Sequence, residues 1–193
     1  MAPGPYVFTD ILDFWFGAAH SVTRGRPRKL WFGKSDQFDA EIRARFGSHA
    51  AEAAAGRLAA WERSPYASLA LVVALDQFPR NIYRGTAAAF AADPLAVARR
   101  AIARGFDRVL HPAERGFLYL PFEHAEDLAL QRRSLQLFRG LTGDAAGSSS
   151  MDYALRHYEI IARFGRFPHR NAILGRPSSA EERAFLEQPG SSF

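Results

Sequence analysis

The sequence predicts an all-α fold, on three observations. Apolar residues recur at helical spacing through most of the 193 residues. Pairs of a capping residue and a proline, such as Ser64-Pro65 and Asp93-Pro94, mark helix starts. Strand signals are nearly absent, because β-branched residues rarely alternate and no Asn-Gly or Asp-Gly turn occurs. We expect about seven to nine helices, joined by short connections and stacked as antiparallel pairs.

The N-terminal aromatic residues are the first candidates for the core. A short first helix is stable only when it docks on other elements, and large aromatic side chains supply the docking area. Core packing is therefore favoured over a ligand platform for Phe14, Trp15, Phe16, Trp31 and Phe32.

Two helices are expected next. Phe38, Ile42 and Phe46 recur at helical spacing behind Ser35, a favoured N-cap residue. Gly47 either stops this helix or interrupts a longer Ala-rich one. The stretch YASLALVVALDQF is apolar almost all round, which is typical of a central helix, and we expect it to end at the proline of residue 79.

Asp93-Pro94 and His111-Pro112 open two further helices, the first closed by Gly105 and the second ending before Pro121. A longer helix is expected from about Glu123 to Leu141.

The last quarter of the chain begins with GDAAGSSS, which is typical of a short flexible linker. The stretch MDYALRHYEIIARF follows as a helix that stops at Gly165. Its expected buried positions are Tyr153, Leu155, Tyr158, Ile161 and Phe164. A capping box over residues 178–181 opens a final short helix.

Bulk composition bounds the class of protein. A chain of this length that is 48% hydrophobic supports one core but not two large domains, so we expect a single domain over residues 1–193. The absence of cysteine excludes disulfides and thiolate metal sites and fits a reducing compartment. No signal peptide and no apolar run of about 18 residues is present. These features predict a cytoplasmic protein without membrane contact.

The net charge of +5 comes almost wholly from arginine. Its densest run, RGRPRK at residues 24–29, lies among Gly and Pro and is typical of a solvated loop. No aromatic residues interleave this run to stack on bases, which argues against a nucleic-acid partner.

Two Phe-Pro segments contain most of the polar candidates. DQFPRNIYRG covers residues 76–85, and RFGRFPHRNAILGR covers residues 163–176. A proline after a helix re-aims the chain and leaves terminal carbonyl groups that Arg and Asn can satisfy, so both segments can be internal braces. Four arginines in fourteen residues exceed that need, and guanidinium groups suit carboxylate or phosphate. The alternative is therefore an anion site in one groove.

The stretch PFEHAEDLALQ is the second candidate region. On a helix starting near Phe122, Glu123 and Asp127 share a face, and acidic residues also suit a helix N-terminus. His124 beside these carboxylates is suited to acid–base chemistry or metal ligation. The candidate ligand-binding residues are Asp76, Arg80, Asn81, Arg84, Glu123, His124, His157, Arg166, His169, Arg170 and Asn171.

Metal and nucleophile motifs are missing. No Glu-x-x-His spacing occurs, which argues against a di-iron site. A mixed site of Glu123, His124, His157 and His169 is neither supported nor forbidden by spacing, and His157 suits a hydrogen bond in the packed interior. No cysteine, Gly-x-Ser-x-Gly elbow or phosphate-binding loop is present, so no catalytic residue is assigned. We expect no metal and no cofactor.

Five stretches, FWFG, LDQFPRN, YLPFEHAED, RFGRFPHRNAILGR and SSAEERAFL, together resemble the bacterial domain-of-unknown-function family 924. The resemblance covers almost the whole chain. It implies an all-helical, tetratricopeptide-like array and no established activity.

Three function classes follow from these features. The first is a helical-repeat-like protein whose Arg-rich groove binds an anionic peptide or partner protein. The second is a small-molecule enzyme or sensor that acts on an anionic metabolite with Arg, His and Glu residues. The third is a nucleic-acid-binding protein, which ranks last. Whether the protein is an enzyme stays open at this point.

Overall fold

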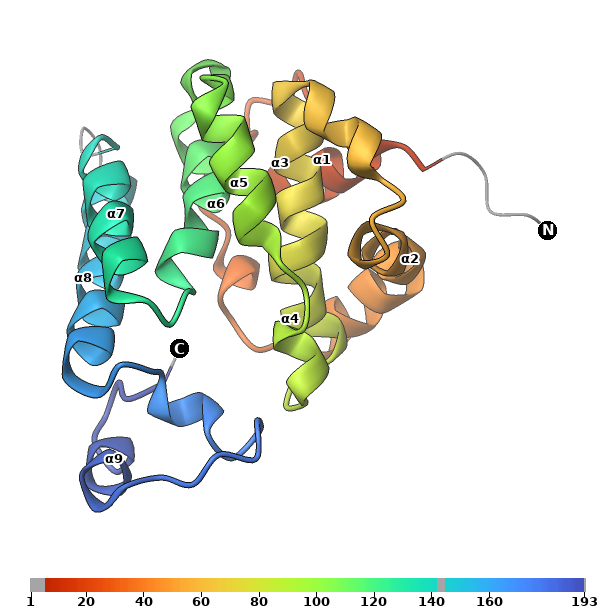
Figure 1. The fold of residues 1–193 in the computed structure, drawn as a ribbon. Coiled ribbons are helices and arrows are strands. Elements are labelled where there is room, and N and C mark those ends of the chain that lie inside the picture. Colours follow the sequence, from red (N-terminus) through yellow and green to blue (C-terminus); the bar gives the residue numbers. More distant parts are fainter. Residues whose placement is uncertain (1–5, 142–144, 193) are drawn as a thin grey trace. The chain divides into compact units, whose positions relative to one another are not determined.

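The computed structural model describes residues 6–141 and 145–192, and in these ranges all regular structure is helical (Figure 1). This confirms the all-α class. Nine α-helical segments occur in the described residues, and α3 and α4 join through a π-helical turn into one rod, so the count agrees with the expected seven to nine. The tetratricopeptide-like stacking stays a prediction. Within the same ranges, no helix has the length and apolar character needed to cross a membrane.

The chain forms two compact units. Unit 1 comprises the chain up to Arg84 together with Ala88–Pro121, and unit 2 comprises Gly85–Ala87 and the chain from Phe122 onward. The expectation of a single domain stays a prediction.

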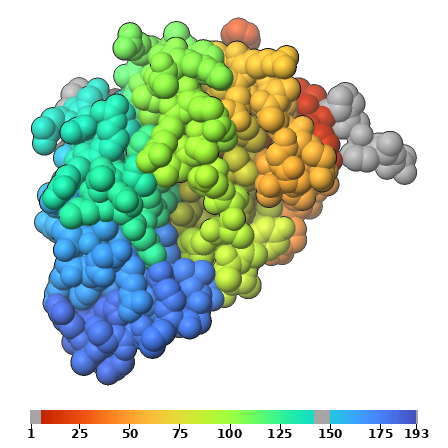
Figure 2. Space-filling model, viewed as in Figure 1, coloured from red at the N-terminus to blue at the C-terminus, as the bar shows by residue number. Residues whose placement is uncertain are grey.

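Unit 1 is built around the central helix α3, against which α1 and α5 pack, while α2 packs against α4 (Figure 1). In the space-filling view α5 forms part of the surface of this unit (Figure 2). Its helices are α1 (Phe8–Phe16), α2 (Asp36–Ala54), α3 (Pro65–Val72), α4 (Phe78–Ile82), α5 (Pro94–Ala103) and α6 (Pro112–Glu123), the last two residues of α6 lying in unit 2.

The core of unit 1 is aromatic. Trp15 is fully buried and meets Phe78 edge to face, with ring centroids 5.7 Å apart. Phe46 stacks on Phe78 at 5.1 Å. Trp15, Phe16 and Trp31 are buried, as core packing requires, whereas Phe14 is partly buried and Phe32 is 73% exposed. Phe32 lies in the loop after a short 3-10 turn and stacks on the edge of the core at Phe117.

The expected caps form. Ser35 accepts a hydrogen bond from the Phe38 backbone N–H, and Ser64 accepts one from Ala67. Asp93 caps α5 in the same way. Because α2 continues to Ala54, Gly47 interrupts this helix and does not stop it.

Pro79 does not end the central helix, so that expectation is wrong. A π-helical turn, η3 (Val73–Gln77), precedes α4, and the Phe78 N–H bonds to the Val73 carbonyl five residues back. The wider π-helical turn accommodates the ring of Pro79 and its missing backbone N–H, so the helix continues through the proline.

The region around Pro121 also differs from expectation. Helix α6 runs through Pro121 and ends two residues later, at Glu123. Pro121 has no backbone N–H to donate, but because it lies in the last turn of the helix, little helix remains for it to disrupt. A turn over residues 124–127 follows. Helix α7 (Leu128–Arg139) starts only after Asp127, whose side chain accepts the Leu130 N–H. Glu123 and Asp127 therefore do not share a helix face.

Unit 2 is built on α7 and α8 (Ala145–Phe164), which lie side by side and antiparallel (Figure 1). A 3-10 turn, η6 (Pro168–Arg170), and α9 (Ala180–Leu186) complete it. The expected linker is helical from Ala145 onward, and its residues 143 and 144 lie outside the described ranges.

The buried stripe of α8 differs from the expected one. Ala154, His157 and Ile161 are buried, whereas Tyr153 and Leu155 are 49% and 42% exposed. The spacing of three and four residues keeps the helical period, and the interior position expected for His157 is confirmed. Gly165 ends the helix as expected, with a positive φ of 69° that favours glycine.

Candidate functional site

The turn after α6 is held in place by hydrogen bonds to its backbone. Gln131 on α7 donates from its side-chain nitrogen to the carbonyl groups of Glu123 (2.6 Å) and Ala125 (2.8 Å). Arg170 donates to the carbonyl of His124 at 2.9 Å. Glu123 is 3% exposed and His124 is partly buried. The turn therefore fixes a buried carboxylate next to an imidazole.

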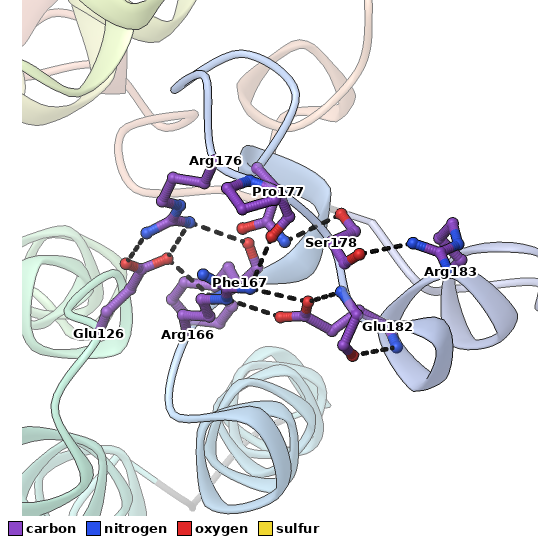
Figure 3. A network of polar contacts seen from close by, with 10 residues as sticks. Glu126, Arg166, Phe167, Arg176, Pro177, Ser178, Glu182 and Arg183 are labelled. Atoms are coloured by element: carbon purple, nitrogen blue, oxygen red, sulfur yellow. Dashed lines mark hydrogen bonds and ion pairs between the residues drawn. The ribbon is translucent and has the colours of Figure 1, made fainter.

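Glu126 in the same turn ties it to the second Phe-Pro segment. Its carboxylate accepts the Phe167 backbone N–H at 2.8 Å and two hydrogen bonds from Arg176, at 2.5 and 2.9 Å (Figure 3). Burial acts to raise the pKa of Glu126, but the bonds from Arg176 and Phe167 outweigh it and hold the pKa below its ordinary value. Glu126 is thus a structural anion.

His157 points from α8 toward Glu123. Its Nδ1 lies 2.9 Å from the Tyr153 carbonyl oxygen and 3.2 Å from Glu123 Oε1. Because a carbonyl only accepts, Nδ1 carries the proton in this arrangement. Burial, followed by the nearby charge of His124, lowers the pKa of His157 to about 3. The ring is therefore neutral near pH 7, and its 3.2 Å contact with Glu123 is not an ion pair.

Glu123, His124 and His157 together present three ligand atoms that all lie within 4.8 Å of one another. The sequence left a mixed site of this kind open and named His169 as its fourth member. The structure brings the first three together. No metal was expected from the sequence, and that expectation stays untested.

Phe167 lies beside this cluster and is fully buried. Its ring centroid is 5.4 Å from that of His157 and 5.6 Å from that of His169. The Arg170 guanidinium lies 4.3 Å above the same ring, and Arg170 is only 7% exposed. The second Phe-Pro segment therefore places one arginine and one histidine around the aromatic ring that packs against His157.

The rest of the segment is an internal brace (Figure 3). Arg166 donates two hydrogen bonds to Glu182, at 2.6 and 2.8 Å. Glu182 also closes a capping box with Ser179, one residue later than expected. The bond from Arg166 is the largest cause that lowers the pKa of Glu182 to about 2. Asn171 is fully buried and donates to Ser178 at 3.1 Å.

The first Phe-Pro segment makes a separate network in unit 1. Arg84 donates two hydrogen bonds to Asp39 on α2, at 2.6 and 2.9 Å, and Asn81 donates a third at 2.7 Å. Burial acts to raise the pKa of Asp39, but these bonds lower it overall. Arg80 lies 3.5 Å from Asp76. The two Phe-Pro segments belong to different units, so one groove lined by both stays a prediction.

Several expected site residues thus take part in bracing. Arg84 and Arg166 each bind a carboxylate of their own unit, as does Arg176. Sequence reasoning missed the partners Asp39, Gln131 and Glu182. For Glu182 a signal existed, because Ser179 stands three residues before it.

Unit 1 also contains an open groove of about 980 Å³. Aromatic residues and the loop of residues 26–28 line it. Its charged lining is balanced, because three acidic residues face three basic ones, and it does not select an acidic partner by charge. The charged lining residues are Asp10, Asp13, Arg26, Arg28, Glu41 and Arg45.

Comparison with known proteins agrees with this fold. A model of the family described as bacterial protein of unknown function, DUF924, matches residues 11–190. A solved structure, that of the protein of unknown function ATU0120 from Agrobacterium tumefaciens, is similar at 44% identity and a TM-score of 0.83. The match covers 93% of this chain and 96% of that one. A search of curated proteins found no match. These relatives supply a fold but no activity.

Proposed function

The chain belongs to the DUF924 family of bacterial proteins, whose function is unknown, and from its site we propose that it binds a divalent transition-metal ion at Glu123, His124 and His157. One observation carries the proposal: a buried carboxylate and two imidazoles offer ligand atoms within 4.8 Å of one another. Atoms that share one tetrahedral ion at about 2.0 to 2.1 Å lie roughly 3.3 Å apart. The 3.2 Å between His157 Nδ1 and Glu123 Oε1 matches that separation.

The donor set indicates the class of ion. Two imidazoles with one carboxylate suit zinc, iron, cobalt or nickel, whereas calcium and magnesium prefer oxygen ligands. Without an ion, His157 Nδ1–H donates to the Tyr153 carbonyl oxygen and lies 3.2 Å from Glu123 Oε1. An ion bound at Nδ1 takes the place of that proton, which moves to Nε2 of the neutral ring.

The surroundings of the cluster favour metal binding in two ways. The low pKa of His157 means that protons compete weakly with an ion near pH 7. Gln131, which clamps the turn that carries Glu123, is fully buried, and its side-chain oxygen has no hydrogen-bond partner among the described residues. A buried acceptor beside the cluster suits a water molecule bound to the ion.

The other functions expected from the sequence have less support. An Arg-rich groove for an anionic peptide needs arginines that face a partner, yet Arg84, Arg166 and Arg176 bind carboxylates within their own units. An enzyme that acts on an anionic metabolite would need a reacting group beyond the binding residues described above. Metal binding requires only the geometry of the cluster.

Cobalt titration tests the proposal. The untagged protein, stripped with a chelator, is titrated with Co²⁺, whose visible absorption reports its ligands. We expect one Co²⁺ ion to bind per chain. The Co²⁺ affinity of the variants Glu123→Gln and His124→Ala should be lower than that of the wild type by about 100-fold or more.

His20→Ala is the matched control, because this histidine is exposed and lies outside the cluster. It should bind Co²⁺ like the wild type. Circular dichroism establishes that each variant is folded. Equal Co²⁺ affinity in His124→Ala and the wild type contradicts the proposal.

A further inference from the structure

We propose that the loop of residues 18–34 in unit 1, called the basic loop below, docks on the surface of a membrane that contains anionic lipids. The proposal does not depend on the metal site, which lies in unit 2. It starts from charge, because a segment with many basic residues and no acidic one is attracted to a negatively charged lipid surface. The basic loop contains no Asp or Glu, and its basic residues are Arg24, Arg26, Arg28, Lys29 and Lys34.

Two of the arginines anchor the basic loop to unit 1. Arg24 donates to Glu114 on α6 at 2.9 Å and to the Gly17 carbonyl at 2.8 Å. Arg28 donates to the carbonyl of the buried Trp15 at 3.0 Å. These hydrogen bonds hold the loop against α6 and the end of α1, so its outer side chains are presented from a fixed backbone.

The other three basic side chains carry the charge that a membrane would meet. Arg26, Lys29 and Lys34 are exposed, and none of them pairs with an acidic residue in the parts of the chain that the structure describes. Exposed arginines on other surfaces, such as Arg100 and Arg163, bind glutamates. The basic loop therefore concentrates positive charge that is open to an anionic surface.

The same loop projects apolar side chains into solvent. Val22 is 84% exposed, Phe32 is 73% exposed and Leu30 is 39% exposed. Val22 and Phe32 are the most exposed large hydrophobic side chains among the described residues. The Phe32 ring rests on Phe117 of α6, with parallel planes and centroids 5.8 Å apart, so α6 supports the ring from one side only.

Charge and apolar projection together favour a lipid surface. Interfacial membrane anchors place apolar side chains in the headgroup region while neighbouring cations meet the anionic lipids. A nucleic acid would account for Arg26, Lys29 and Lys34 but not for the projection of Val22 and Phe32. The sequence predicted no membrane contact because it lacks a signal peptide and an apolar span. A peripheral contact needs neither, since only the tip of the loop enters the bilayer.

Vesicle sedimentation of the full chain tests the proposal. Wild type should bind vesicles that mix phosphatidylglycerol with phosphatidylcholine, more weakly as salt is added, and should not bind phosphatidylcholine alone. Replacing both lysines, Lys29→Gln with Lys34→Gln, should lower the affinity by about 25-fold, because each basic residue near the surface contributes about 5-fold. Phe32→Ser should lower it by about 10-fold.

Matched controls come from unit 2. Arg132→Gln with Arg133→Gln removes two exposed charges from α7, and Leu155→Ser removes a side chain of α8 that is 42% exposed. Both controls should bind the mixed vesicles like the wild type. Circular dichroism establishes that each variant is folded.

A fluorescent reporter separates a bilayer from a soluble acidic partner. Lipids brominated in their acyl chains should quench the added fluorescence of Phe32→Trp, whereas the tryptophan of Leu155→Trp should stay unquenched. Absence of binding to the mixed vesicles overturns the proposal, as does equal binding to phosphatidylcholine alone. Vesicle binding that is unchanged in Phe32→Ser and leaves Phe32→Trp unquenched also overturns it, and identifies the loop as a purely electrostatic surface for an acidic protein.

Discussion

The two Phe-Pro segments share a sequence pattern but differ in structure. In unit 1, Pro79 lies inside a continuous rod, because the π-helical turn before it absorbs the proline. In unit 2, Gly165 ends α8, and Pro168 begins a 3-10 turn that redirects the chain. The same dipeptide is therefore a helical residue pair in one unit and an elbow in the other.

The difference lies in what surrounds each segment. Both use arginine to bind a buried carboxylate, Asp39 in unit 1 and Glu182 in unit 2. Only the elbow of unit 2 places histidine and arginine around a buried phenylalanine next to Glu123. The network of unit 1 therefore only stabilises the fold. The segment of unit 2 also packs beside the imidazoles and the carboxylate of the candidate site.

The largest expected effect comes from removing the phenylalanine of each segment. Phe78 and Phe167 are both fully buried, so either change to Ala should cost about 3 to 5 kcal/mol of unfolding free energy. Only Phe167→Ala should also weaken Co²⁺ binding, because the Phe167 ring packs against His157. Urea denaturation and Co²⁺ titration measure the two effects.

Tryptophan fluorescence separates the units in that experiment, because Trp15, Trp31 and Trp61 all lie in unit 1. Circular dichroism follows both units. Unchanged Co²⁺ affinity in Phe167→Ala would remove the link between the elbow and the metal site.

The arginine forks should give the next largest effect. Arg176→Ala removes two bonds to Glu126 and one to the Phe167 carbonyl, and we expect a loss of about 2 kcal/mol. Arg84 is 39% exposed at its side chain, so Arg84→Ala should cost about 1 kcal/mol. Arg163→Ala, which breaks an exposed pair, should change stability by less than about 0.5 kcal/mol. If urea denaturation showed a larger loss of unfolding free energy for Arg84→Ala than for Arg176→Ala, the contacts of Arg176 in unit 2 would not be the stronger ones.

Acid should weaken the braces in a defined pH window. The pKa of Glu182 is lowered from 4.5 to about 2 in the folded chain. Because the folded pKa lies below the unfolded one, the contribution of this carboxylate is complete above pH 4.5 and is lost as the pH falls toward 2.

The stability difference between the wild type and Glu182→Gln should therefore shrink over that window, as thermal unfolding at a series of pH values will show. Asp39→Asn is the matched variant in unit 1, where the pKa of Asp39 is also lowered. A difference that stays constant from pH 5 to pH 2, roughly the span between the two pKa values, would mean that Glu182 is not stabilised as an anion.

The prolines should give small effects. Pro168→Ala should lower stability by about 0.5 to 1 kcal/mol, because the unfolded chain gains freedom. Pro79→Ala should not lower it, because alanine restores a backbone donor and suits a helix. Urea denaturation of the two variants checks this contrast. A larger loss from Pro79→Ala would show that the π-helical turn depends on the proline.

The sequence predicted the features that depend on local chemistry. The N-caps expected at Ser35, Ser64 and Asp93 are confirmed. Such a cap needs only a side-chain oxygen that accepts a hydrogen bond from the first turn of the helix, so the local sequence predicts it. The resemblance to the DUF924 family is confirmed by the match over residues 11–190. Local propensity failed at Pro79, where a π-helical turn accommodates the proline, and at Pro121, which lies only two residues before the end of its helix.

The site was predicted only in part for a different reason. Glu123, His124 and His157 were all named from the sequence, yet their meeting depends on how α6 ends and on the face that α8 turns inward. The interior position expected for His157 is confirmed, whereas the exposure of Tyr153 could not be read from the apolar pattern alone. Acceptors such as Asp39 and Glu182 lie far in sequence from the arginines they bind, so no spacing rule connects them.

The metal site itself is tested most directly by anomalous diffraction from crystals of the wild-type protein grown with Zn²⁺ and recorded at the zinc absorption edge. We expect an anomalous peak bonded to Glu123, His124 and His157, with metal–ligand distances of about 2.0 to 2.2 Å. A peak only at surface residues such as His20, or no peak on these three side chains, would contradict it.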